Sequence, residues 1–400
     1  MFRLVPPAGA PIPLMDITRS MIARSQYKRR GERLYQKIRN HSKQKYCFFV
    51  DSGRTALLLG LKALTRQADA FKNEVVIPAY TCFTVPAAVV RSGLKVHPVD
   101  IDPMTMDYDY SRLESTDFSK VLAIVGDNLF GIPSDWERLQ SLARDNAVFL
   151  VDDAAQAMGL TYGDEPLGSL GDFGFYSLGR GKNLSVYAGG VLVADNERLA
   201  QLIGEEYQSL SPNGFLTEIA ALGKTVMTSL FLHPPLFWIP AGMPFLRLGE
   251  TVFDTEFNVA RLSPFQVALT ETVFDRLEGF NERRRSNSRR LIDIIRSYTG
   301  YEIPGATETD HPTYLRLPVL TEGPEIRDRL IRVLRKSGIS ASSMYPSAIH
   351  RIPALKKHLA PAGNKFPGAD QVVDRLVTLP THPYLTEKDM GRIVATLTGA

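Results

Sequence analysis

The feature that most constrains the fold is an alternation of short apolar runs with helix-like segments between residues 46 and 195. Runs such as VLAIV and VFLV are apolar at successive positions rather than at every second one. A strand with this pattern is buried on both faces, which is typical of a parallel sheet covered by helices on each side. The sequence therefore predicts an α/β fold, in which ligands bind at the carboxyl ends of the strands.

Three regions are predicted along the chain. Residues 1–45 are proline-rich and then basic, which indicates an extended arm followed by a surface helix. Residues 46–260 carry the alternating pattern and form the predicted large domain, with an apolar insertion at about 215–250. Residues 261–400 are expected to form a smaller α+β domain, whose character is clear from about residue 275 onward. The basic run Arg283–Arg285 in its long helix is expected to be a solvated face.

Composition excludes several classes of protein. Lys and Arg total 47 and Asp and Glu total 43, and the resulting net charge of +4 suits anionic small molecules but is too small for a nucleic-acid-binding protein. The two cysteines, Cys47 and Cys82, form no CxxC pair, so we expect no disulfide scaffold and no metal site. The N-terminus lacks a continuous apolar core, so no signal peptide is expected and the protein is predicted to be cytoplasmic.

Polar residues stand where several predicted strands end. Lys182 lies among glycines and small polar residues just before an apolar run, and Asp153 ends a buried strand. Pyridoxal phosphate needs a lysine for its aldehyde and a carboxylate for its pyridine nitrogen, so these two are the candidate catalytic residues. Its phosphate needs a helix N-terminus, which the strand-to-helix turn at residues 52–55 offers. The candidate cofactor-binding residues are Ser52, Gly53, Arg54, Thr55, Tyr80, Phe83, Asp153, Gln156, Ser177 and Lys182.

Two aromatic residues in this set have alternative roles. Tyr80 and Phe83 lie in the loop after the second predicted strand, where either could stack on the cofactor ring. Tyr80 is alternatively a core residue, and the sequence leaves both roles open.

Six stretches carry a resemblance to a known family: DSGRTALLLGLKAL, VIPAYTCFTVPAAVVRSGLKVHPVDIDPMTMDYD, FLVDDAAQAMG, GDFGFYSLGRGKNLSVYAGGVLVADN, FNVARLSPFQVAL and FPGADQVVDRLVTLPTHPYLT. In this order they resemble the DegT/DnrJ/EryC1/StrS family of pyridoxal-phosphate-dependent sugar aminotransferases, which have the aspartate-aminotransferase fold (fold type I). The resemblance implies a mostly parallel seven-stranded sheet flanked by helices and a smaller C-terminal α+β domain. It also implies transfer of an amino group from an amino acid, with glutamate expected, to a nucleotide-linked keto-sugar in polysaccharide, glycolipid or natural-product biosynthesis.

The resemblance assigns roles to individual residues. Lys182 resembles the lysine that binds the cofactor aldehyde, Asp153 the partner of the pyridine nitrogen, and Gln156 a residue near the ring hydroxyl. The positions that match phosphate contacts are Gly53, Arg54 and Ser177. Asn258 resembles an asparagine that the family supplies across a dimer interface, so the resemblance implies a homodimer with composite sites.

Other positions concern the substrate. Arg54 stands where the family usually has Thr, so it either pairs with the cofactor phosphate or reaches an anionic substrate. Tyr345 and His350, in the stretch MYPSAIH, match a segment that lies near the substrate in the family. Some relatives replace the lysine with His and act as dehydratases, and Lys182 argues against that activity here.

The stretch VMTSLFLHPPLFWIPAGMPFL, residues 226–246, does not fit the family pattern. A membrane-spanning helix needs roughly 20 apolar residues, and four prolines would interrupt this one. The stretch is either a hydrophobic subdomain packed on the body or on a partner, or an exposed patch that contacts a membrane surface or receives a lipid-bearing substrate. Two alternative functions stay open: a pyridoxal-phosphate enzyme acting on a lipid-linked or other non-sugar carbonyl compound, and a non-catalytic regulator.

Overall fold

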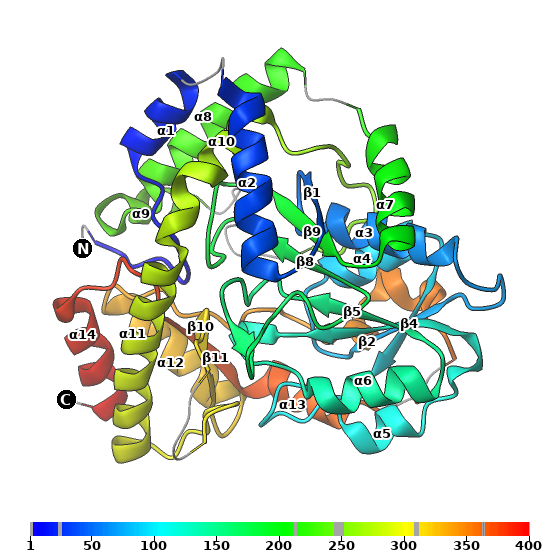
Figure 1. Cartoon of the computed structure of the whole chain (residues 1–400). Helices are drawn as coiled ribbons and strands as arrows, with labels where there is room; N and C mark the ends of the chain where they lie inside the picture. The colour runs from blue at the N-terminus through cyan, green and yellow to red at the C-terminus, as the bar shows by residue number, and fades with distance from the viewer. Residues whose placement is uncertain are drawn as a thin grey trace.

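A seven-stranded sheet forms the centre of the computed structural model, which describes residues 3–22, 26–211, 214–243, 252–307, 312–361, 363 and 365–399 (Figure 1). In spatial order its strands are β1 (Tyr46–Val50), β9 (Gly190–Ala194), β8 (Phe173–Ser177), β5 (Phe149–Asp153), β4 (Val121–Asp127), β2 (Glu74–Pro78) and β3 (Lys95–Val99). The strands from β8 to β3 are parallel, and β9 runs antiparallel to both of its neighbours. This arrangement confirms the predicted α/β fold and the mostly parallel seven-stranded sheet.

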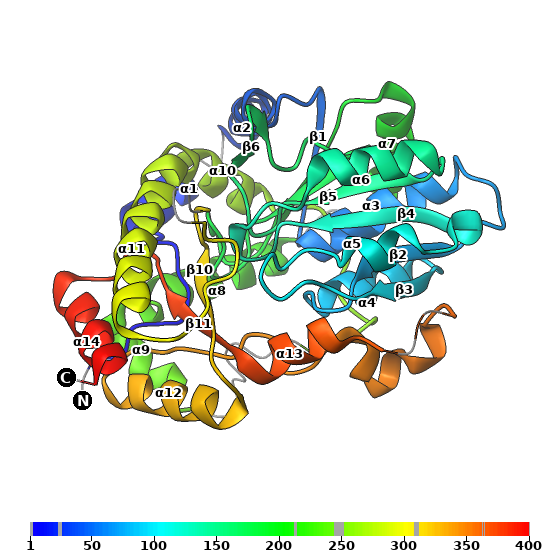
Figure 2. The ribbon, with the colours of Figure 1, turned by 90° about the horizontal axis from the view of Figure 1, so that it is seen from below.

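Both faces of the sheet are covered, which explains the continuous apolar runs. Along β5, Leu150 belongs to one hydrophobic core and its neighbour Val151 to the other. The core around Val151 also contains side chains of α3 (Gly53–Thr65), α4 (Thr84–Arg91) and α7 (Glu197–Ser209). The opposite core contains side chains of α2 (Tyr27–Ser42), α6 (Trp136–Asp145) and α10 (Pro264–Val273). Figure 2 shows α6 on one side of the strands and α4 on the other.

The C-terminal part of the chain contains a two-stranded antiparallel sheet of β10 (Arg316–Leu320) and β11 (Leu376–Pro380). The accompanying helices are α11 (Leu277–Tyr298), α12 (Pro324–Lys336), α13 (Pro367–Arg375) and α14 (Glu387–Thr398). The N-terminal arm lies against this part (Figure 1), because Val5 forms a bridge with Ile339 and Arg3 forms an ion pair with Asp389. The predicted domain division at residues 45 and 260 stays a prediction.

The remaining elements are short or peripheral. They are α1 (Leu14–Ile22), α5 (Tyr110–Glu114), β6 (Thr161–Tyr162), β7 (Glu165–Pro166) and the 3-10 helices η2 (Phe118–Lys120), η3 (Leu129–Gly131), η5 (Phe274–Arg276), η6 (Ile349–Arg351) and η7 (Pro353–His358).

The predicted apolar insertion folds into α8 (Phe215–Phe231) and α9 (Pro234–Ala241), while residues 244–250 lie outside the described part. None of the helices in the described ranges combines the length and the apolar character that a membrane crossing requires. The insertion packs on the N-terminal arm, where the Ser229 hydroxyl donates to the carbonyl of Ile12 at 2.6 Å. Its outer side exposes apolar side chains, among them Leu216 at 80% and Trp238 at 42%. One side of the insertion therefore packs on the rest of the protein, and its other side exposes apolar side chains.

The expectation that Arg283–Arg285 form a solvated face is wrong for Arg284. The Arg284 side chain is fully buried, whereas Arg283 is exposed. The Arg284 guanidinium donates to the backbone carbonyls of Gly9 at 3.0 Å and Lys182 at 3.2 Å. Successive residues of a helix are about 100° apart around its axis, so a run of three cannot stay on one exposed stripe of a packed helix.

Candidate active site

Lys182 lies in the loop that joins β8 to β9, at the carboxyl end of β8. Its side chain is half-buried, and burial lowers the pKa of its amine below the ordinary value. Arg284 holds the loop through the carbonyl of Lys182, and it also donates to the carbonyl of Asn183 at 3.3 Å. A lowered pKa increases the fraction of neutral amine, which is the nucleophilic form.

Two carboxyl groups stand side by side near this lysine. Asp127 ends β4 and Asp153 ends β5, and the two residues are partners in the parallel register of these strands. Burial raises the pKa of Asp153 to about 6, against the opposing effect of Lys182. Burial and the charge of Asp153 raise the pKa of Asp127 well above its ordinary value, and the Thr81 hydroxyl donates to Asp127 Oδ2. Burial and mutual repulsion therefore disfavour a state in which both carboxyl groups are charged.

The predicted phosphate site lies at the N-terminus of α3. Ser52 caps this helix, because its hydroxyl accepts from the amide of Thr55 at 3.2 Å. Ser52 also forms a bridge with Gly189, and a Cβ on Gly53 would lie 3.3 Å from the Cβ of Ser177. The turn after β1 thus meets the end of β8, although the two are far apart in the sequence. The positive end of the helix dipole and the hydroxyl groups favour an anion such as phosphate at this place.

Asp51 occupies the same turn. Its carboxylate accepts hydrogen bonds at 2.6 Å from the Thr55 hydroxyl and from the side-chain amide of Asn258 in the same chain. Burial raises the pKa of Asp51, and these hydrogen bonds act in the opposite direction. The Arg54 guanidinium packs over the ring of Phe257, 4.5 Å from the ring centroid. Both Arg54 and Asn258 therefore lie beside the predicted phosphate site, while their roles toward phosphate, substrate or a second subunit stay predictions.

Aromatic side chains from two regions of the chain meet beside the site. The ring centroid of Tyr345 lies 5.5 Å from that of Tyr80 and 6.0 Å from that of Phe83, on which it is stacked. The Tyr345 hydroxyl accepts from the side-chain amide of Gln156 at 3.2 Å. Tyr80 is fully buried among these rings, so the structure supports its core role, and stacking of Tyr80 or Phe83 on a cofactor stays a prediction.

His350, the other predicted substrate residue, has different surroundings. Its ring stacks on Phe366 with 4.5 Å between centroids, and its Nε2 lies 3.4 Å from a carboxylate oxygen of Asp370. Burial lowers the pKa of His350, and Asp370 acts in the opposite direction. The Ile349 amide donates to the carbonyl of Ala79 at 2.8 Å, which ties this segment to the end of β2. The role of His350 toward substrate stays a prediction.

The structure adds residues that the sequence analysis did not single out: Asp127, Thr81, Arg284, Arg316 and Ser342. A signal for Asp127 exists in the sequence, since it ends an apolar strand, and neighbouring parallel strands end at the same edge of a sheet. Arg316 and Ser342 belong to the C-terminal part of the chain and lie in no recognisable motif. Only the folded structure places them beside the loop that carries Lys182.

The described residues fit pyridoxal phosphate. Gln156 Oε1 is buried and has no hydrogen-bond partner in the described part of the chain, as expected of an atom that faces a bound polar group. Any side chain larger than that of Gly53 would extend toward Ser177, so glycine keeps space at the helix N-terminus. An amine of lowered pKa, a buried carboxylate and a helix N-terminus are together the groups that this cofactor requires.

Comparisons with known proteins identify the family of the chain. The model of the DegT/DnrJ/EryC1/StrS aminotransferase family matches residues 17–398. The chain is 24% identical over 346 residues to dTDP-3-amino-3,4,6-trideoxy-alpha-D-glucose transaminase of Streptomyces venezuelae, covering 86% of this chain and 80% of that protein. It is 31% identical over 300 residues to GDP-4-keto-6-deoxy-D-mannose 3-dehydratase of Yersinia pseudotuberculosis, covering 74% of this chain and 72% of that protein.

A solved structure supports the same fold. The sugar aminotransferase CalS13 of Micromonospora echinospora has a TM-score of 0.79 to this chain at 20% identity, covering 99% of this chain and 100% of that one. Family match and fold agree over nearly the whole length, and the chain belongs to the DegT/DnrJ/EryC1/StrS aminotransferase family.

Proposed function

We propose that the protein is a pyridoxal-phosphate-dependent aminotransferase that moves an amino group from an amino acid, glutamate in this proposal, to a nucleotide-linked keto-sugar. The observation that carries the proposal is the meeting of Lys182, Asp153 and the N-terminus of α3 at one edge of the sheet. The transaminase relative from Streptomyces venezuelae is named for a dTDP-linked sugar. The product would serve polysaccharide, glycolipid or natural-product biosynthesis.

In this proposal the residues of the chain hold the cofactor at both ends. Pyridoxal phosphate, when bound, supplies an aldehyde carbon that accepts the amino group and a ring that delocalises negative charge. The N-terminus of α3, with Ser52 and Ser177, would bind the phosphate. The Asp153 carboxylate would keep a proton on the ring nitrogen, and Gln156 would bind the ring hydroxyl.

Lys182 would move the protons of the reaction. Its Nζ would bind the cofactor aldehyde, and burial lowers the pKa of this amine, which favours the nucleophilic neutral form. The same nitrogen would take the proton from the donor α-carbon and would later return a proton as a general acid. The buried rings of Tyr345 and Phe83 exclude water from this side of the site.

Chemical reduction tests the proposal directly. Borohydride treatment of the purified protein should fix the cofactor on the peptide that contains Lys182, as mass spectrometry would show. The Lys182→Ala variant should be neither labelled nor active. Lys224→Ala, which removes an exposed lysine of the insertion, is the matched control and should keep both properties. Full activity of Lys182→Ala would contradict the assignment.

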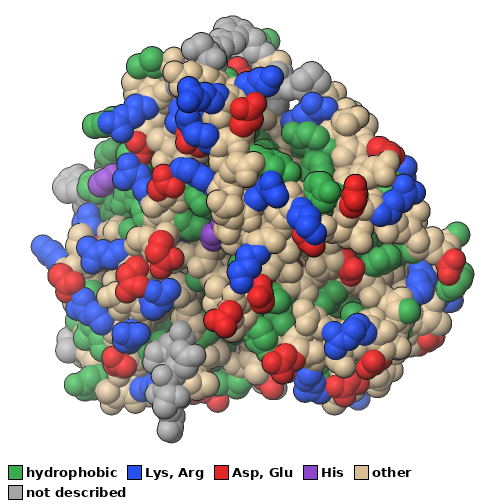
Figure 3. Space-filling view, viewed as in Figure 1, with side chains coloured by type: hydrophobic (Ala, Val, Ile, Leu, Met, Phe, Trp, Pro, Cys, Tyr) green, Lys and Arg blue, Asp and Glu red, His purple; other side chains and the backbone are tan. Residues whose placement is uncertain are grey.

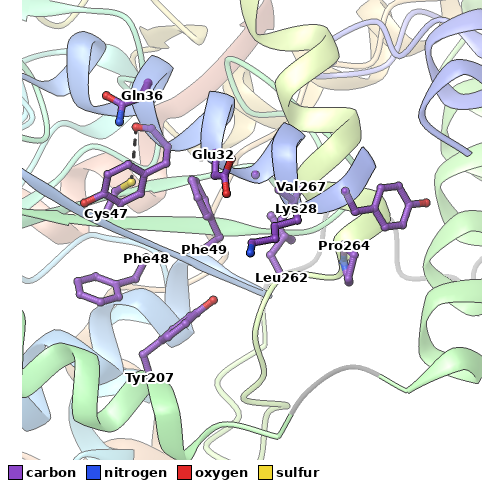
Figure 4. Close-up of a pocket in the computed structure, with 13 residues that line it drawn as sticks. Lys28, Glu32, Gln36, Cys47, Phe48, Phe49, Tyr207, Leu262, Pro264 and Val267 are labelled. Carbon is purple, nitrogen blue, oxygen red and sulfur yellow. Dashed lines mark hydrogen bonds between the residues drawn. The ribbon is translucent and has the colours of Figure 1, made fainter. Parts of the chain in front are cut away.

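The proposed homodimer has structural support at the edge strand β1. A hollow of about 550 Å³ opens there between α2 and α7 (Figure 4), and Figure 3 shows hydrophobic side chains on this face. Its lining includes Lys28, Glu32, Phe48, Phe49, Tyr207 and Leu262. The Leu262 amide donates to the carbonyl of Phe49 at 3.0 Å, and the segment before Leu262 carries Asn258. The hollow is apolar, and its lining also contains one positive and one negative side chain, which the same surface of a second copy of this chain could complement.

Mixed dimers test whether Asn258 acts across the interface. Lys182→Ala and Asn258→Ala chains are each expected to be inactive or weak alone. If Asn258 completes the site of the other subunit, a mixed dimer holds one intact site and regains activity. Mixing that restores no activity, in dimers verified by light scattering, would place Asn258 in its own subunit's site.

We also propose that the outer side of α8 and α9 contacts a membrane surface. A groove of about 650 Å³ between these helices and the lysine loop is lined by apolar side chains together with Arg180 and Lys224. Anionic headgroups would pair with these cations while Trp238 and its apolar neighbours contact the lipid. Sedimentation with anionic vesicles should occur and should be weakened by Trp238→Ser. Wild-type protein that stays in the supernatant would refute the contact.

The two alternative functions have less support. The two curated relatives reported above are named for nucleotide-linked sugars, which does not favour a lipid-linked or other non-sugar acceptor. A regulator without catalysis would have no need of a buried Asp153 beside a lysine of lowered pKa.

A further inference from the structure

Arg316, the first residue of β10, places its guanidinium beside the loop that carries Lys182. A Cβ built on Gly181 would lie 3.7 Å from Arg316 Nη2, so the guanidinium lies against the residue that precedes the lysine. Arg316 Nη1 donates to the Ser342 hydroxyl at 3.3 Å. Burial and, to a smaller extent, the charge of Arg316 lower the pKa of Lys182, which agrees with this short separation.

The guanidinium of Arg316 has no carboxylate partner in the described ranges of the chain. No Asp or Glu there lies within 4.0 Å of it, and its Nε is buried without a hydrogen-bond partner. Burial lowers the pKa of Arg316 to about 10. The Nε of the buried Arg284 also has no partner in the described ranges, but backbone carbonyls accept from both of its Nη atoms, whereas only the Ser342 hydroxyl there accepts from Arg316. Arg316 is half-buried and its Nε is shielded from water, so an unused donor on this cation is costly, and a bound anion would remove that cost.

Two kinds of anion would enter this site in turn: the carboxylate of the amino donor and the diphosphate of the acceptor. In an amino acid, the α-carboxylate is bonded directly to the carbon that bears the amino group, so its binding group must lie close to Lys182 Nζ. In a nucleotide-linked keto-sugar, ring atoms separate the reacting carbon from the diphosphate. The position of Arg316 beside Gly181 therefore fits the carboxylate, whose two oxygens also match the planar guanidinium.

We propose that Arg316, supported by Ser342, binds the α-carboxylate of the amino donor and of the keto acid that forms from it. This inference rests on the proposed aminotransferase function and names the chemical class of the donor. Fixing the carboxylate would also fix the orientation of the neighbouring C–H bond toward Lys182 Nζ. The enzyme would therefore discriminate strongly between an amino acid and its α-amide.

Equilibrium binding tests the inference independently of turnover. Calorimetry would measure the Kd of 2-oxoglutarate and of UDP for the purified protein and for the Arg316→Met and Arg316→Lys variants. We expect Arg316→Met to raise the Kd of 2-oxoglutarate roughly 10- to 100-fold and Arg316→Lys to raise it less, with the Kd of UDP unchanged. Arg290→Met, at an exposed arginine paired with Glu387, is the control and should change neither value. An unchanged Kd of 2-oxoglutarate, or a loss of UDP binding instead, would overturn the inference.

A donor comparison separates binding of the carboxylate from a purely structural role. The wild type should use L-glutamate far better than L-isoglutamine, its α-amide, and Arg316→Met should lose most of that preference through KM for glutamate. A variant that keeps the full preference would refute the role. If Arg316→Met fails to fold, Ser342→Ala serves as the second variant and should weaken 2-oxoglutarate binding by a smaller factor. Borohydride labelling of Lys182 should persist in each folded variant, whereas its failure in the wild type would instead refute the aminotransferase function.

Discussion

Asp127 and Asp153 are register partners at the carboxyl ends of β4 and β5, and burial raises the pKa of both carboxyl groups. Two adjacent carboxylates in a buried place cannot both ionise at low cost, and the charge of Asp153 raises the pKa of Asp127. The Thr81 hydroxyl fixes the orientation of Asp127. Asp153 is the carboxyl group expected to pair with a ring nitrogen, and the neighbouring Asp127 disfavours a second negative charge at this strand end.

The pH dependence of cofactor binding follows from this pair. Because the raised pKa of Asp153 is about 6, its charged form is lost as the pH falls below that value, and cofactor affinity should fall with it. Asp153→Asn should lack this acidic limb and lose roughly 100-fold or more in amino-transfer rate. Asp127→Asn is the matched control at the neighbouring strand end, since its amide oxygen can still accept from Thr81. Fluorescence titrations between pH 5 and 8 would check this, and an acidic limb displaced by Asp127→Asn would show that Asp127 is charged.

Neighbouring arginines of α11 should differ sharply in their effect on stability. Arg284→Met should lower the free energy of unfolding by roughly 3 kcal/mol, because the buried carbonyls of Gly9, Lys182 and Asn183 lose their donor. Arg283→Met, one residue earlier and exposed, should change it by less than about 0.5 kcal/mol. Urea unfolding of both variants is the measurement. Equal effects would contradict the role of Arg284 in holding the lysine loop.

Substitutions at Gly53 and Ser177, which lie against each other, should weaken the binding of pyridoxal phosphate. Ser177→Ala removes one hydroxyl from the proposed phosphate site, so the Kd of pyridoxal phosphate should rise roughly 10- to 100-fold. Gly53→Val should have a larger effect, since its side chain would meet Ser177 and the ring of Phe175. Equilibrium dialysis would measure both, with the exposed Ser209→Ala as control. Unaltered affinity in Gly53→Val would place the phosphate elsewhere.

The Asp389 carboxylate should make the free energy of unfolding depend on pH in the acidic range. Burial alone would raise its pKa, but hydrogen bonds from Arg3, Thr386 and Arg392 hold the pKa well below the ordinary value. The stabilisation is present above the unfolded-state pKa of about 4 and is lost as the pH falls toward the lowered folded-state pKa. The free energy of unfolding of Asp389→Asn should therefore fall less steeply than that of the wild type between about pH 4 and pH 2. Parallel curves in urea unfolding at several pH values would argue against the contribution.

The sheet and half of the site could be predicted because their signals are local. A strand covered on both faces must be apolar at consecutive positions, which is why VLAIV and VFLV predict a parallel sheet before any contact is known. Polar residues at strand ends, such as Asp153 and Ser52, follow from the same rule, since parallel strands end at one edge. The motifs around Lys182 then identify the family.

Local sequence patterns were enough to predict the α/β fold, Lys182 and Asp153, because each pattern depends on residues a few positions apart. The folded structure was needed to identify the long side chains that surround the site: Arg284 points inward, Arg316 lies beside the loop that carries Lys182, and Tyr345 contacts Gln156. Helix rotation and the packing of the C-terminal part set these contacts, and no spacing along the chain encodes a distance between segments that meet only after folding.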